Sequence, residues 1–143
     1  MATRSTTHFM FSAKETAAIV YRHWDGYPEV AGEAILRFLR TVKENTADTR
    51  FGDAEYLAAR YVAFLADEFS SQQSFVDGVW VEKALPKYAF ISVGVCMSDP
   101  GDIEYRYRVH CWDVPTSEGL PPVTYDNVYD GSSFDLNMEA INV

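Results

Sequence analysis

The sequence contains only two cysteines among 143 residues, and neither belongs to a Cys-x-x-Cys pair. This scarcity excludes a disulfide framework. Cys96 and Cys111 fall in strand-like stretches, where a free cysteine is usually a small buried hydrophobe. The two thiols would be close if these strands are neighbours, and a reduced pair is favoured. The three histidines, at 8, 23 and 110, lack the spacing of metal ligands, so we expect no metal site and no cofactor.

Several other signals are missing. No Gly-x-Ser-x-Gly elbow and no glycine-rich phosphate loop are present. The sequence therefore offers no motif for nucleophilic catalysis and none for phosphate binding. No apolar run approaches the ~18 residues of a membrane helix. Residues 1–7 lack the apolar region of a signal peptide. We therefore expect a cytoplasmic protein with no membrane partner. The lack of a complete catalytic constellation argues against an enzyme without excluding one.

Positive charge is absent from the last quarter of the chain. The net charge is −9, and residues 109–143 contain six acidic residues but no lysine or arginine. Such a surface repels nucleic-acid phosphate and attracts basic partners, although it is also a simple means of solubility. The six residues are Asp113, Glu118, Asp126, Asp130, Asp135 and Glu139.

Two amphipathic helices are expected, over residues 29–44 and 54–69. In the first, Ala31, Ala34, Ile35, Phe38, Leu39 and Val42 recur at three- and four-residue steps. The second repeats this pattern and follows Asp53, a good N-cap residue. Residues 70–74 are expected to form a turn or a short linker.

Strand patterns flank the helices. They cover residues 8–11, 17–22, 79–81, 88–97, 103–112 and 123–125. Tyr105, Tyr107 and Val109 alternate with Arg106 and Arg108, which predicts two different faces. The Asp-Pro-Gly-Asp turn at residues 99–102 predicts that 88–97 and 103–112 pair as a hairpin.

The expected fold is a single α+β domain over residues 1–143, with two helices on one face of a mostly antiparallel sheet. The element order is β-β-α-α-β-β-β. Residues 114–143 are expected to be an irregular acidic C-terminal segment of the same domain, with 123–125 as a short edge strand.

The densest motif is Arg22-His23-Trp24-Asp25-Gly26-Tyr27-Pro28. It resembles the His-Trp-Asp-Gly-Tyr-Pro signature of small uncharacterised bacterial and phage proteins, and the resemblance spans roughly residues 17–112. The resemblance implies no catalytic residue, because the group has no established activity.

The motif has two interpretations. Arg22, His23, Trp24, Asp25 and Tyr27 either form a ligand site or build a structural corner in which Asp25 caps the turn and His23 bonds to it or to the backbone. The structural interpretation is favoured, because a turn aspartate usually satisfies local amides.

The preferred functional hypothesis is a non-enzymatic acidic interaction protein. The resemblance extends this to a phage-type inhibitor that covers the basic, nucleic-acid-binding surface of a host or defence protein. The hypothesis expects the late carboxylates to share one face with Asp99, Asp102 and Glu104, and its partner-binding residues are Asp99, Asp102, Glu104, Asp126, Asp130 and Asp135. The alternative is a small-molecule or nucleotide-binding protein, or an enzyme, with its site at His23–Tyr27. A third hypothesis is a structural domain that assembles through its sheet edge.

Overall fold

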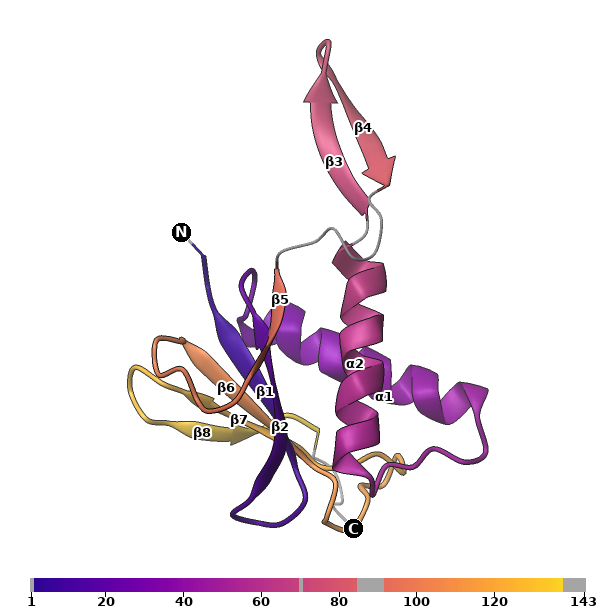
Figure 1. The fold of residues 1–143 in the computed structure, drawn as a ribbon, viewed down its shortest axis with the longest axis vertical. Helices are drawn as coiled ribbons and strands as arrows, with labels where there is room; N and C mark the ends of the chain where they lie inside the picture. The colour runs from indigo at the N-terminus through magenta and orange to yellow at the C-terminus, as the bar shows by residue number, and fades with distance from the viewer. Residues whose placement is uncertain (1, 70, 85–91, 138–143) are drawn as a thin grey trace.

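The computed structural model describes residues 2–69, 71–84 and 92–137, and it confirms the α+β class. One sheet contains β1 (Ser5–Met10), β2 (Thr16–Arg22), β5 (Val93–Cys96), β6 (Tyr105–His110), β7 (Val123–Asn127) and β8 (Ser133–Asp135). The spatial order is β5-β2-β1-β6-β7-β8. The helices α1 (Glu33–Asn45) and α2 (Ala54–Phe69) cover one face of this sheet, which we call the helix face; the other is the open face (Figure 1).

Strand β1 lies at the centre of the sheet. It pairs antiparallel with β2 and parallel with β6, and all six of its residues are buried. Phe9 points into the helix face, where it contacts Tyr61 of α2 at 5.6 Å between ring centroids. On β6, Tyr107 and Val109 join the same core, so the predicted alternation along this strand is confirmed.

Both predicted helices form, with a modified start to the first. Pro28–Gly32 is a single π-helical turn (η1), in which the Glu33 amide donates to the Pro28 carbonyl. The predicted apolar stripe of α1 faces the core, with Ile35, Phe38 and Leu39 buried. Asp53 caps α2 as predicted, since its carboxylate accepts from the Tyr56 amide at 3.3 Å.

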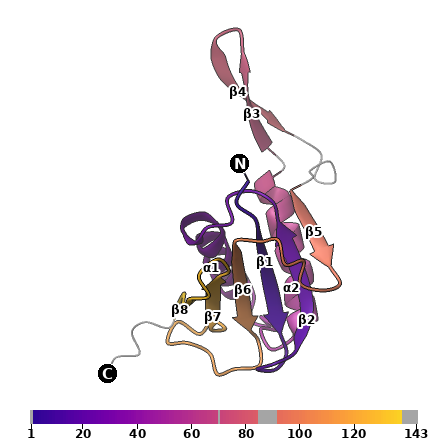
Figure 2. The same ribbon diagram turned by 90° about the vertical axis from the view of Figure 1, so that its left-hand side faces the viewer.

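A two-stranded arm extends away from the sheet beyond the end of α2. It consists of β3 (Ser71–Val76) and β4 (Val79–Ala84), paired antiparallel (Figures 1 and 2). Asp77 and Gly78 connect them with φ of 50° and 79°, the pattern of a type I′ turn. The expected turn at 70–74 is therefore wrong over 71–74, because the Asp-Gly pair was the true hairpin signal.

The predicted hairpin between residues 88–97 and 103–112 is also wrong. Strands β5 and β6 are separated by β2 and β1 in the sheet. The turn itself forms, with the Gly101 amide donating to the Asp99 carboxylate at 3.2 Å, but it belongs to a crossover. Asp99 binds Arg106 on the open face, so this crossover runs over that face, as Figure 2 also shows. Residues 88–91 lie outside the described residues.

The C-terminal segment is more regular than expected. The strand predicted at 123–125 forms as β7, but it is not an edge strand, because it pairs with β6 on one side and with β8 on the other. The edge on this side of the sheet is β8. Within the described part of this segment, the irregular description therefore holds only for the residues outside these two strands. Cys96 and Cys111 are both free thiols, which agrees with the reduced state that the sequence favoured. Among the described residues, no helix is long and apolar enough to cross a membrane.

Candidate functional site

The motif residues point in different directions. Arg22 is buried on the helix face, with its guanidinium carbon 5.1 Å from the centre of the Phe69 ring. Its Nε donates to the Trp24 carbonyl at 2.6 Å. His23 does not bond to Asp25; its Nδ1 lies 2.7 Å from the Tyr21 hydroxyl. The described structure therefore does not assemble these side chains around one cavity.

Gly26 fixes the position of the corner. Its amide donates to the Thr3 carbonyl at 2.8 Å, and its carbonyl accepts from the Tyr107 hydroxyl at 2.8 Å. A Cβ at this position would lie 2.8 Å from the Cβ of Ser5, so only glycine fits without a shift. Asp25 has φ of 54° and accepts a 3.4 Å hydrogen bond from Tyr27. The corner ties the β2–α1 connection to β1 and β6.

Tyr27 leads to a pocket that the sequence did not indicate. The pocket has a volume of about 300 Å³ and lies where β1 and β6 begin and β7 ends. We call it the tyrosine pocket. Its lining residues are Thr3, Tyr27, Glu104, Tyr105, Asn127 and Tyr129. Tyr129 is 82% exposed and forms an outer wall, whereas Tyr27 and Tyr105 are partly buried.

The pocket continues into a row of aromatic rings on the helix face. Tyr105 lies 6.5 Å from Tyr107 and 6.4 Å from Tyr125, measured between ring centroids. Tyr125 stacks on Phe134 at 5.2 Å. Phe134 is 48% exposed, so the row emerges from the core onto the surface.

The surroundings of the pocket are acidic. Burial raises the pKa of Tyr125, and the nearby Glu29 carboxylate raises it further. Glu104 accepts a hydrogen bond from the Arg4 amide at 2.6 Å and lies 3.8 Å from the Arg4 guanidinium. Asp25 and Glu29 are exposed, and no ion pair joins either to a described residue. A cation entering here would therefore meet aromatic faces and an excess of negative charge.

The six predicted partner-binding carboxylates fall into three groups. Asp99 and Asp126 both bind Arg106, and Asp126 also binds Arg108 at 2.6 Å. Burial alone would raise the pKa of Asp126, but hydrogen bonds from Arg108 and Ser133 hold it below its usual range.

The other four predicted carboxylates lie elsewhere. Asp102 and Glu104 both face Arg4. Asp130 accepts a 2.8 Å hydrogen bond from the Ser132 amide in the β7–β8 turn, and Asp135 is exposed on β8. The late carboxylates do not all share one face, because Glu118 binds Arg40 of α1 on the helix side.

Acid–base and nucleophilic groups offer little chemistry in the described residues. Burial raises the pKa of the Cys111 thiol to about 12, so it stays protonated at neutral pH. Burial lowers the pKa of His8 to about 4, and Thr6 and Thr16 are its hydrogen-bond partners. The described residues contain no group of His, Cys, Asp and Glu arranged to hold a metal ion.

Comparisons with protein-family models, curated proteins and solved structures give no match for this chain. The resemblance of residues 17–112 to the bacterial and phage group therefore stays a prediction. Sequence reasoning selected Tyr27 and Glu104 but missed Tyr105, Asn127 and Tyr129 as their neighbours. The concentration of tyrosines in 105–129 was the only available signal.

Proposed function

We propose that this protein is a non-enzymatic binding protein whose partner is the basic surface of another protein. The observation that carries the proposal is how the chain uses its arginines. Each one is engaged within the protein, and six of the eight are in ion pairs that offset their positive charge. Ion pairs with carboxylates of the chain hold Arg4, Arg37, Arg40, Arg50, Arg106 and Arg108.

The two remaining arginines donate to backbone carbonyls. Arg22 bonds to Trp24, and Arg60 bonds to Thr49 at 2.6 Å. Exposed carboxylates, in contrast, remain without an ion pair to any described residue. They include Asp25, Glu29, Glu44, Glu55, Asp130 and Asp135. The outward-facing charge is therefore dominated by carboxylates, which favours association with a basic surface and disfavours direct contact with nucleic acid.

A basic surface is typical of a protein that binds nucleic acid. A protein that covers such a surface competes with the nucleic acid, which is the inhibitor function that the charge pattern favours. Exposed apolar residues on the arm support a protein partner rather than a small ion, because Val79, Trp80 and Val81 all lie at the surface.

The experiment compares two variants with equal net charge. Asp25→Asn/Glu29→Gln removes two carboxylates beside the tyrosine pocket, and Glu44→Gln/Glu55→Gln removes two near the α1–α2 loop. Binding of a labelled arginine–glycine peptide is measured by fluorescence anisotropy from about 50 to about 200 mM salt. Wild type should bind more weakly as salt rises, and a labelled DNA duplex should not bind.

The first variant should bind the peptide more weakly than the second at every salt concentration. Asparagine tolerates the positive φ of residue 25, so the fold is preserved. Absence of peptide binding to wild type at low salt would overturn the proposed function. Equal binding of the two variants would mean that the peptide responds to the net charge of the protein and not to the position of its carboxylates.

A further inference from the structure

The tyrosine pocket has the composition of a site for a single cationic side chain. Three of its residues are tyrosines, and its polar groups are the Glu104 carboxylate, the Asn127 amide and the Thr3 hydroxyl. The electron-rich face of an aromatic ring attracts a cation, and several rings around one cavity add their attraction. A neutral apolar ligand would gain nothing from the carboxylates nearby.

The chain already forms cation–π contacts, but not at this pocket. Among the described residues they join Arg22 to Phe69, Arg37 to Phe64 and Arg50 to Tyr56. Arg4 approaches Glu104 from the Asp102 side, where its guanidinium lies 3.4 Å from the Asp102 carboxylate. The tyrosine faces of the pocket therefore carry no cation from the part of the chain that the structure describes.

We propose that the tyrosine pocket binds the guanidinium group of an arginine on the protein partner. This inference rests on the proposed function and names the contact through which the basic partner is held. The planar guanidinium stacks on tyrosine rings and donates several hydrogen bonds in one plane, whereas the lysine ammonium is a compact, strongly hydrated charge. The Asn127 side-chain oxygen already accepts hydrogen bonds from the Tyr129 and Asp130 amides. The Glu104 carboxylate and the exposed carboxylates of Asp25 and Glu29 therefore provide the acceptors and the charge complementarity at the rim.

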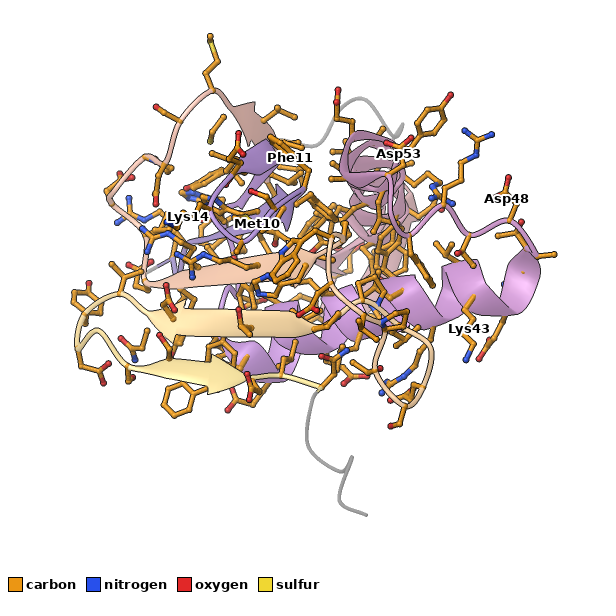
Figure 3. All side chains as sticks on the ribbon, turned by 90° about the horizontal axis from the view of Figure 1, so that it is seen from below. Met10, Phe11, Lys14, Lys43, Asp48 and Asp53 are labelled. Atoms are coloured by element: carbon orange, nitrogen blue, oxygen red, sulfur yellow. The ribbon has the colours of Figure 1, made fainter. Side chains whose placement is uncertain are left out.

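Tyr129 makes the inference testable without disturbing the fold. Its ring is 82% exposed, so its removal should leave the core intact. Tyr129→Ala deletes one aromatic wall, and Tyr129→Phe keeps the ring while removing the hydroxyl. Phe11→Ala is the matched control, because Phe11 is also an exposed aromatic but follows the end of β1, whereas the tyrosine pocket lies where β1 begins (Figure 3).

Two probes separate the failure of this inference from the failure of the proposed function. The first is the arginine–glycine peptide, compared with a lysine–glycine and a citrulline–glycine peptide. Tyr129→Ala should weaken binding of the arginine peptide about tenfold, while Tyr129→Phe and Phe11→Ala bind like wild type. The arginine peptide should bind wild type more tightly than the lysine peptide, and the uncharged citrulline peptide should bind least.

The second probe is N-acetylarginine amide, followed by NMR of the tyrosine ring protons. It should shift the signals of Tyr27, Tyr105 and Tyr129 more than those of Tyr56, which already lies on Arg50. Wild-type peptide binding with an unaffected Tyr129→Ala variant would overturn the pocket assignment alone. Equal binding of the arginine and lysine peptides would overturn the guanidinium assignment. No binding by either probe would overturn both this inference and the proposed function.

Discussion

Acid should destabilise this protein through His8, whose side chain is buried on the open face of the sheet. The residue is 6% exposed. Burial lowers its pKa to about 4; Asp99 and Asp126 oppose this shift, and Arg108 and Arg106 reinforce it. These four groups, on the crossover, β6 and β7, are the charges that face the imidazole.

The size of this destabilisation follows from the difference between the pKa of His8 in the folded protein and in the unfolded protein. The unfolded imidazole binds a proton near pH 6.5, whereas the folded one does so only near pH 4. Because the unfolded state binds more protons in this window, the free energy of unfolding falls as the pH falls. The slope approaches about 1.4 kcal/mol per pH unit, so His8 alone should remove about 1.5 kcal/mol between about pH 6.5 and pH 5.

The assay is urea unfolding followed by tryptophan fluorescence at several pH values. His8→Gln removes the titrating group, so its free energy of unfolding should change less over this range than that of wild type. His110→Gln is the control, since burial also lowers the pKa of His110, but this residue is only half-buried. Equal pH dependence of wild type and His8→Gln would refute the reasoning, whatever the absolute stability of the variant.

Three further predictions concern the corner at Gly26 and the absence of a stabilising metal ion. Gly26→Ala should destabilise the protein by about 1–3 kcal/mol in urea unfolding, because the new Cβ would lie 2.8 Å from both Ser5 Cβ and the Thr3 carbonyl oxygen. Gly52→Ala, which meets nothing closer than 4.0 Å, should cost much less, and equal losses would contradict this steric reasoning. Asp25→Ala should lower the free energy of unfolding by about 1 kcal/mol, because alanine is strained at the φ of 54° found there. Asp25→Gly should not lower it, since glycine adopts a positive φ freely. Equal losses would mean that the contacts of the Asp25 side chain, and not its backbone conformation, stabilise the corner. A chelator should leave the thermal midpoint unchanged, and a large drop would reveal a metal site that stabilises the fold.

The helices and the faces of β6 could be predicted because their signals are local. The apolar stripe of α1 and the Asp53 cap of α2 lie within a few residues of the structure they specify. The same holds for Tyr107 and Arg108, which point to opposite faces because neighbouring strand residues alternate. Local patterns failed where pairing is between distant segments. The Pro-Gly turn before β6 suggested a hairpin, but β1 competes for the β6 edge and pairs with it in parallel.

The candidate site shows the same division. The motif drew attention to residues 22–28, and Tyr27 does line the pocket, but Arg22 enters the core and His23 bonds to Tyr21. The excess of acidic residues in 109–143 is a property of the composition and can be read from the sequence. It did not show that Asp99 and Asp126 neutralise Arg106, because ion pairing depends on which side chains the sheet brings together.

The sequence by itself determined the two helices, the α+β class, the free thiols and the excess of negative charge, since each follows from composition or from contacts a few residues apart. The tertiary structure alone decided the sheet order, the crossover over the open face, the internal neutralisation of the arginines and the tyrosine pocket. The pocket, for example, brings together Thr3, Tyr27, Tyr105 and Tyr129, which are spread over more than a hundred residues of chain. Long-range pairing places them together, and no periodicity within one segment encodes a contact between two.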